Sequence, residues 1–182
     1  MCDIFYTKID VANKCANFIK NNIPSIINFN KDIIIEPSAG DGAFIKGIEN
    51  LARMSIFFDQ NPQDKRICER NYLTFDFERM DRTDLSGLWY DDVHVVGCPP
   101  FGEAPAYDMA VEFIKISCTY AKSISFILPQ GLDYTFPAEY YCVFKTNLPP
   151  NSFNKIVAAA GAEDKKVIDY DIAATFQIWV KR

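Results

Sequence analysis

The sequence predicts an α/β domain with a mostly parallel β-sheet, and three observations lead to this prediction. The chain has 182 residues, of which 49% are hydrophobic, so it can bury a core of its own as one domain. Short β-branched runs alternate with stretches of helical periodicity, as in strands joined by crossover helices. A glycine turn follows one of these runs, and Pro99-Pro100 stops another, because proline cannot continue a central ladder.

Each expected element rests on a local pattern. Helices are predicted where apolar residues recur every three or four positions, as Val11, Cys15 and Phe18 do. The final two strands have no helix between them, so they should pair antiparallel as a hairpin. The expected elements are a helix at 8–22, a strand at 31–36, a helix at about 43–51, strands at 54–58 and 92–97, a helix at about 105–120, a strand at 122–128, and strands at about 153–160 and 172–180; residues 60–91 and 130–150 fit no element.

Composition and charge exclude several classes of protein. The net charge of −5 and the pI of about 4.9 argue against a free-standing, sequence-independent nucleic-acid binder. A local basic cleft or a partner could still supply the contacts to nucleic acid. No stretch approaches about 18 uncharged apolar residues, and the N-terminus lacks the pattern of a signal peptide, so we expect no membrane span and an intracellular location. Six cysteines without a Cys-x-x-Cys pair, and a single histidine, predict reduced thiols and no metal site. That histidine, His94, lies in mid-strand and is expected to be packed in the core.

The most informative local feature is the glycine turn after the strand at 31–36. Gly40-Asp41-Gly42 leads from this strand into a helix, and glycine permits backbone angles and a close ligand approach that other residues forbid. Asp59 lies 19 residues beyond Gly40, at the tip of the following strand, where a carboxylate can accept hydrogen bonds from ribose hydroxyls. The pair indicates a nucleoside-binding site at the carboxyl end of the sheet.

Two loops of the chain resemble a known family. Glu36-Pro37-Ser38-Ala39-Gly40-Asp41-Gly42 resembles the cofactor loop of S-adenosylmethionine-dependent adenine-N6 methyltransferases, and Val95-Val96-Gly97-Cys98-Pro99-Pro100-Phe101-Gly102 resembles their catalytic Asn/Asp-Pro-Pro-Tyr/Phe loop. The resemblance implies a Rossmann-like class I fold, with a seven-stranded, mostly parallel sheet and a C-terminal antiparallel hairpin, in a single domain over residues 1–182. Nicotinamide-dependent redox chemistry would share the glycine turn and the acid, but it leaves the Pro-Pro-Phe loop without a role.

The resemblance also implies a role for each matching residue. Asp59 is expected to bind the ribose of S-adenosylmethionine, and Asn71, with Tyr72 beside it, matches a usually acidic position at the adenine edge. An asparagine can still accept a hydrogen bond there through its amide oxygen. The remaining expected cofactor-binding residues are Tyr6 and Thr7 near the methionine end and Glu36, Ser38, Gly40 and Gly42 in the loop.

The expected catalytic residues are Cys98, Pro99, Pro100 and Phe101, and the first departs from the family pattern. The family's chemistry needs two acceptors for the target amine, a side-chain oxygen and the carbonyl of the first proline, while the aromatic ring stacks on the extruded base. A thiol is a poor acceptor, and losing one preorganised contact can lower a rate roughly 10²–10³-fold.

Several interpretations of Cys98 stay open. The chain is an enzyme that works slowly or on an altered target, a catalytically silent homologue that supports a partner, or a protein in which Cys98 is an introduced substitution. Alternatively, Cys98 is simply a small residue that fills the space at the end of the strand. A cysteine nucleophile of the cytosine-C5 type would follow the proline of its loop, whereas Cys98 precedes Pro99.

The expected substrate is nucleic acid, either DNA or RNA. No appended recognition domain accompanies the predicted fold, so single-stranded or structured substrates, or action with a protein partner or a second copy of the chain, suit it better than long duplex DNA. The aromatic residues of 130–150 either form a wall of the base pocket or pack into the core: these are Tyr134, Phe136, Tyr140, Tyr141 and Phe144.

Overall fold

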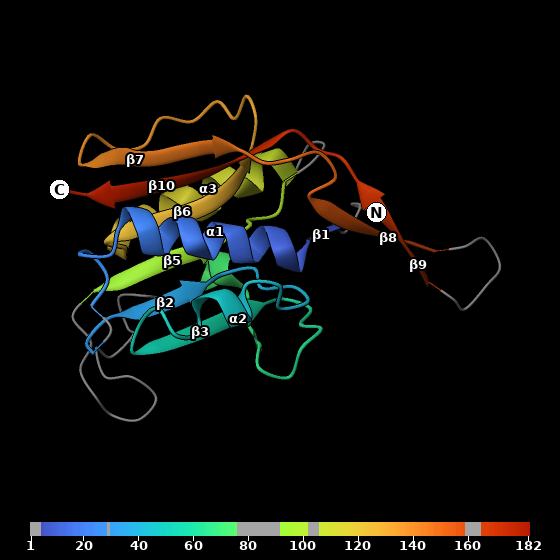
Figure 1. Cartoon of the computed structure of the whole chain (residues 1–182), viewed down its shortest axis with the longest axis horizontal. Coiled ribbons are helices and arrows are strands. Elements are labelled where there is room, and N and C mark those ends of the chain that lie inside the picture. The colour runs from blue at the N-terminus through green and yellow to red at the C-terminus, as the bar shows by residue number, and fades with distance from the viewer. Residues whose placement is uncertain (1–4, 29, 76–91, 102–105, 159–164) are drawn as a thin grey trace.

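Within the residues that the structure describes, seven strands form a central β-sheet (Figure 1). The structure is a computed structural model, and it describes residues 5–28, 30–75, 92–101, 106–158 and 165–182. The strands of this sheet are β2 (Ile33–Glu36), β3 (Met54–Asp59), β4 (Cys68–Glu69), β5 (Val93–Gly97), β6 (Ser123–Pro129), β7 (Tyr140–Asn147) and β10 (Ala174–Lys181). Their order is β4-β3-β2-β5-β6-β10-β7; the first five run parallel, and β10 and β7 are antiparallel to their neighbours. The predicted fold class is confirmed.

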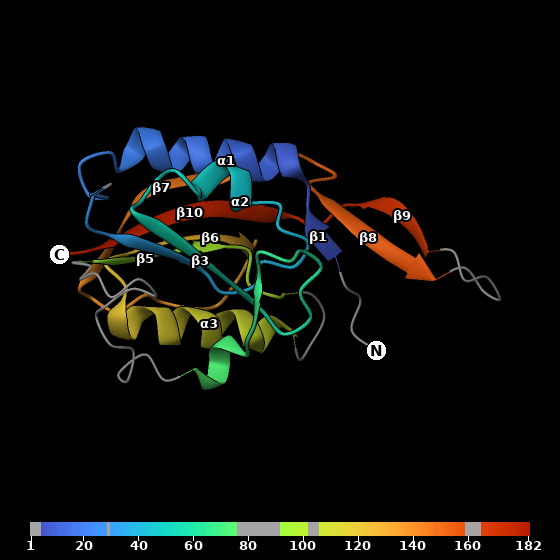
Figure 2. The same ribbon diagram turned by 90° about the horizontal axis from the view of Figure 1, so that it is seen from below.

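Helices cover both faces of this sheet (Figure 2). The helices α1 (Ile9–Asn22) and α2 (Ile45–Ile48) lie on one face, and α3 (Ala106–Tyr120) lies on the other beside the short 3-10 helix η1 (Tyr72–Thr74). Consecutive residues of β2 point to opposite faces, so Ile34 joins the core under α1 while Ile33 and Ile35 join the core under α3. Nowhere in the described ranges is a helix long and apolar enough to cross a membrane.

The predicted helix at 43–51 is shorter than expected. Tight turns flank α2, because the N–H of Ile45 donates to the Gly42 carbonyl at 3.1 Å and that of Leu51 donates to the Ile48 carbonyl at 2.9 Å. These turns bring the chain back to the start of β3 within a few residues.

The predicted pairing of the last two strands is wrong. β10 pairs with β6 and β7, with Ile178 opposite Phe144 in β7, so the antiparallel pair at the edge of the sheet uses a segment that fitted no expected element. The strand predicted at 153–160 corresponds to β8 (Phe153–Ala158), which pairs with β9 (Lys165–Tyr170) and β1 (Phe5–Thr7) in a separate antiparallel sheet. β10 is buried on both faces and therefore takes two partners, whereas β7 is an edge strand whose exposed positions weaken its pattern.

A buried polar cluster joins the strands at the edge opposite their carboxyl ends. His94 is fully buried, as expected; its Nδ1 lies 2.8 Å from Ser123 Oγ and its Nε2 lies 3.1 Å from Asp32 Oδ2. Asp32 also accepts the backbone N–H groups of Asn28 at 2.6 Å and Asp92 at 3.3 Å. Burial alone would raise the pKa of Asp32, but the His94 contact and these N–H bonds outweigh it and hold that pKa below its usual value.

We expect Asp32→Ala to lower the free energy of unfolding by about 2–4 kcal/mol, because it leaves buried donors without an acceptor. Because the pKa of Asp32 is lowered in the folded state, its stabilisation is present above the ordinary aspartate pKa and is lost as the pH falls through the lowered value. Denaturant unfolding at pH 7 and at stepwise lower pH measures both effects. Glu112→Ala is the control, since its pair with Lys115 is exposed and should contribute less than about 0.5 kcal/mol. Equal losses in the two variants would refute the role given to Asp32.

Candidate functional site

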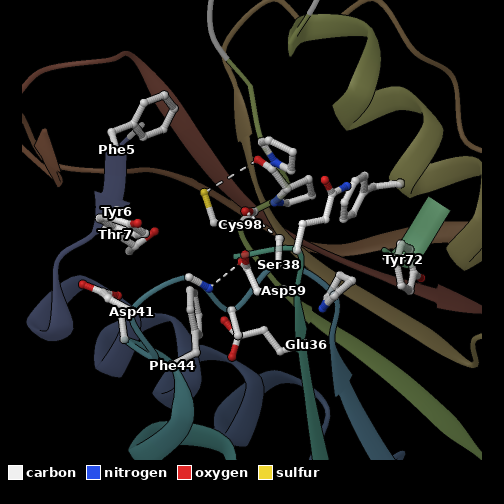
Figure 3. Close-up of a pocket in the computed structure, with 18 of the residues that line it drawn as sticks. Phe5, Tyr6, Thr7, Glu36, Ser38, Asp41, Phe44, Asp59, Tyr72 and Cys98 are labelled. Carbon is white, nitrogen blue, oxygen red and sulfur yellow. Dashed lines mark hydrogen bonds between the residues drawn. The ribbon is translucent and has the colours of Figure 1, made fainter. Parts of the chain in front are cut away.

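The carboxyl ends of β2, β3 and β5 meet at one edge of the sheet and surround a cavity of about 430 Å³ (Figure 3). This volume lies within the range of small-molecule sites, roughly 300–1,000 Å³. Most of the site residues predicted from sequence line it, and they come from β1, from the loops after β2, β3 and β5, and from η1. They are Tyr6, Thr7, Glu36, Ser38, Gly40, Asp59, Tyr72, Cys98, Pro99, Pro100 and Phe101.

The glycine turn after β2 is held by the acid at the end of β3. The Gly40 N–H donates to Asp59 Oδ2 at 2.7 Å, and the Asn61 N–H donates to Asp59 Oδ1 at 2.8 Å. Gly40 has a φ of +53°, and the ring of Tyr6 packs so closely on it that an added Cβ would lie 2.7 Å from a ring carbon. The turn therefore requires glycine for its backbone angle and for the space it leaves to Tyr6.

Glu36, the last residue of β2, carries a buried carboxyl group toward the cavity. It is 2% exposed, and Oε2 has no hydrogen-bond partner among the residues that the structure describes. Burial first, and then the nearby charges of Asp41 and Asp59, raise the pKa of Glu36 well above its ordinary value. A cation placed in the cavity would pair with this carboxyl and reverse that shift.

The loop after β5 is fixed to the loop after β2. The Ser38 hydroxyl donates to the Cys98 carbonyl at 2.9 Å, and Cys98 Sγ lies 4.0 Å from the Pro99 carbonyl oxygen (Figure 3). Burial raises the pKa of the Cys98 thiol to about 12, and the nearby charge of Glu36 adds to this shift. Cys98 is therefore a neutral thiol at physiological pH, with neither the charge nor the reactivity of a thiolate.

Phe101 lines the cavity but offers no open face to a base in this conformation. Its side chain is 2% exposed, with ring centroids of Phe5 at 5.3 Å and Phe153 at 5.8 Å. Phe5 in turn packs on Tyr170, so β1, β8 and β9 together supply the surroundings of Phe101. The sequence predicted neither the separate sheet of β1, β8 and β9 nor the packing of its aromatic rings around Phe101.

Two predicted site residues lie outside the cavity lining. Gly42, at φ +84°, shapes the turn, while the Asn71 side chain accepts the Leu73 N–H at 3.0 Å and caps η1. Asn71 lines a separate polar hollow with Gln60, Glu69, Arg70, Thr74 and Phe75.

Several residues that line the cavity were missed by sequence reasoning. Met109 and Phe113 lie four positions apart on the face of α3 that was expected to be core, so their spacing indicated burial but not a site. The hydroxyl of Tyr72 is hydrogen-bonded to Ser117 at 2.8 Å, and its ring stacks on Phe113, so the two rings form an aromatic end of the cavity.

The aromatic residues of 130–150 do not line this cavity. Phe136 stacks on Trp179 with ring centroids 4.0 Å apart, and the Tyr140 hydroxyl donates to the carbonyl of Ala121. Ala121 lies just before β6, at the opposite edge of the sheet. The core interpretation is confirmed for Phe136 and Tyr140, which are buried, but not for Tyr141, which is 40% exposed; Tyr140, Tyr141 and Phe144 belong to β7.

Comparison with known proteins addresses the fold. No protein-family model matches the chain, and no curated protein matches it in sequence. Among solved structures, the methyltransferase subunit of a type I restriction-modification system from Streptococcus thermophilus is 14% identical over 100% of this chain and 46% of its own, with a TM-score of 0.61. A presumed RNA methyltransferase from Pyrococcus horikoshii is 10% identical over 94% and 84%, with a TM-score of 0.59, and the 23S rRNA methyltransferase ErmE is 11% identical over 95% and 68%, with a TM-score of 0.54.

The chain has a methyltransferase fold. Sequence identities of 10–14% show a shared fold only, so the chemistry of the cavity has to be inferred from the residues that line it.

We expect Gly40→Ala to destabilise the chain by about 2–3 kcal/mol, from the cost of a left-handed alanine and from displacement of Tyr6. Gly131→Ala is the matched control, because Gly131 has a φ of +79° but nothing within 4 Å of an added Cβ, and it should cost only about 1 kcal/mol. Thermal or denaturant unfolding compares the two. Equal costs would contradict the close packing of Tyr6 on the turn.

Proposed function

We propose that this chain binds S-adenosylmethionine and transfers its methyl group to an exocyclic amine of adenine in nucleic acid. The observation that carries the proposal is that Glu36, Asp59 and the Cys98-Pro99-Pro100 loop line one cavity at the carboxyl edge of the sheet. Ligands of open α/β sheets bind at this edge. One end of the cavity is acidic and the other is aromatic, which suits a ligand with an ammonium group and a nucleobase.

The residues present fit the functional groups of the cofactor. The unpartnered Oε2 of Glu36 would accept from the ammonium group of the methionine part. Each carboxylate oxygen of Asp59 already accepts one N–H and keeps a further lone pair for a ribose hydroxyl. Tyr72 and Phe113 would hold the adenine ring by apolar contact, and Tyr6, seated on Gly40, would cover the methionine end.

When bound, the cofactor supplies a methyl group on a positively charged sulfur. The chain's own residues would place the acceptor. The Pro99 carbonyl has no competing N–H on its own residue and would accept a hydrogen bond from the target amine. The Ser38 bond to the Cys98 carbonyl keeps this loop in register with the cofactor loop. Orientation of this kind reduces the entropic part of the barrier.

The cavity is acidic, so a nucleic-acid substrate is compatible with it only if the phosphate backbone stays outside. Glu36, Asp41 and Asp59 face or border the cavity, and a phosphate would be repelled there. A single extruded base carries no such charge. Extruding a base is least costly in single-stranded or structured nucleic acid, so these are the proposed substrates. A protein partner or a second copy of the chain would supply further contacts to the nucleic acid.

A second function, a catalytically impaired homologue that acts as a partner or regulatory subunit, is favoured by two specific observations. Cys98 places a neutral thiol where the family has an oxygen acceptor, and Phe101 is buried against Phe5 and Phe153. Such a protein would keep the cofactor cavity and lose rate at the methyl-transfer step.

We expect cofactor binding to release protons. Because the pKa of Glu36 is raised in the free protein, the carboxyl is protonated over a range above the ordinary glutamate pKa, and pairing with the ammonium group lowers that pKa. Affinity should therefore rise with pH through this range. Isothermal titration in two buffers of different ionisation enthalpy measures the release, which Glu36→Gln should abolish and Asp64→Asn, outside the cavity, should leave intact. No detectable cofactor binding would refute the proposed function.

Methyl transfer itself separates the two functions. With labelled S-adenosylmethionine and single-stranded DNA or RNA containing unmodified adenine, we expect Cys98→Asn to be roughly 10²-fold faster than wild type, since it restores an oxygen acceptor. Absence of transfer by the wild type to any adenine substrate, together with activity of Cys98→Asn, would favour the impaired homologue. Transfer by neither, with the cofactor bound, would refute adenine methylation.

A further inference from the structure

The acceptor side of the cavity presents one oxygen and one sulfur where the family pattern has two oxygens. Cys98 Sγ and the Pro99 carbonyl oxygen lie 4.0 Å apart, and both residues line the cavity (Figure 3). The Ser38 hydroxyl, a neighbouring oxygen, already donates to the Cys98 carbonyl. At the two positions where the family pattern has oxygen acceptors, a target amine would therefore meet one oxygen, the Pro99 carbonyl, and one thiol.

The sulfur does not act as a replacement acceptor. Burial raises the pKa of the Cys98 thiol to about 12, so the group is neutral, and a neutral thiol accepts hydrogen bonds weakly. A primary amine has two N–H groups, and in this site one of them would be left unpaired against sulfur. A buried donor without a partner costs enough to discriminate between substrates roughly 5- to 150-fold.

We propose that Cys98 selects a secondary exocyclic amine, N6-methyladenine, so that the reaction yields N6,N6-dimethyladenine. The inference rests on the proposed function. Such an amine carries one N–H, which donates to the Pro99 carbonyl, and one methyl group, which takes the place of the second N–H. The polarizable, apolar thiol is a favourable neighbour for that methyl group, as sulfur is for carbon in protein cores.

The step balances without a further reagent. The nitrogen lone pair forms the new N–C bond as the bond between that carbon and the donor sulfur breaks, and the electron pair of the broken bond stays on sulfur. The nitrogen then loses its one proton, which is directed toward the Pro99 carbonyl and passes to water. The neutral product has no N–H and keeps no hydrogen bond to Pro99, which favours its release.

The test compares identical single-stranded RNA oligonucleotides that contain one adenine or one N6-methyladenine, and a matched DNA pair. The wild type should show a kcat/KM at least roughly 5-fold higher on the methylated base, and the same preference in anisotropy measurements of binding with S-adenosylhomocysteine present, where no turnover occurs. Cys98→Ser adds an oxygen with little change in volume and Cys98→Asn restores the family acceptor, so both should shift the preference toward unmodified adenine. Cys98→Ala, which adds no oxygen, should keep the wild-type preference.

The outcomes separate this inference from the proposed function. Cofactor titration of every variant comes first, and loss of binding in the wild type would overturn both. With the cofactor bound, equal or better use of unmodified adenine by the wild type would overturn the selection by Cys98 and leave the proposed function standing. An unchanged preference in both Cys98→Ser and Cys98→Asn, or no turnover and no binding preference on either base, would also overturn it.

Discussion

The carboxylate of Asp59 is the interaction on which the arrangement of the cleft depends. β2 and β3 run parallel, with Glu36 opposite Phe57, so the glycine turn and the acid reach the same edge of the sheet. Asp59 then accepts the N–H groups of Gly40 and Asn61 on its two oxygens, which closes the turn over the end of β3. Hydrogen bonds to a charged acceptor are stronger than neutral ones, so this one side chain can maintain the positive φ at Gly40 on which Tyr6 is seated.

The same arrangement makes the cavity an electrostatic well for cations. Burial first, and then the charges of Asp41 and Asp59, raise the pKa of Glu36 and that of Tyr6. Carboxyl groups held close together in a buried site disfavour one another's ionisation, and a cationic ligand would favour it. Under the proposed function, this charge distribution would let an acidic chain act on nucleic acid, because the cation bound in the cavity would be the small ligand and the phosphate backbone would remain outside.

Sequence patterns predicted the parts of the molecule that local chemistry specifies. The parallel strands, the turn at Gly40 and the approach of Asp59 to it all follow from residues close together in the chain. The pairing of β10 with β7 was not predicted, because β7 is an edge strand whose mixed pattern fitted no expected element. The Asn71 side chain was assigned to the cofactor, yet it caps η1; a short polar side chain before a turn has a local use that competes with any ligand.

Cys98 departs from the sequence pattern that its loop resembles, whereas Phe101 matches that pattern but is buried. Burial of Phe101 against Phe5 and Phe153 stabilises the loop by about 1.5–3 kcal/mol, which a base would have to replace before it could stack on that ring. Stacking on a base contributes a similar amount, about 1–3 kcal/mol, so exchange of one for the other gains little. In this chain Phe101 therefore acts mainly as an anchor. Together with the Ser38 bond it fixes the Pro99 carbonyl, so in the proposed reaction recognition of the target would depend on the hydrogen-bonding groups around the reacting nitrogen.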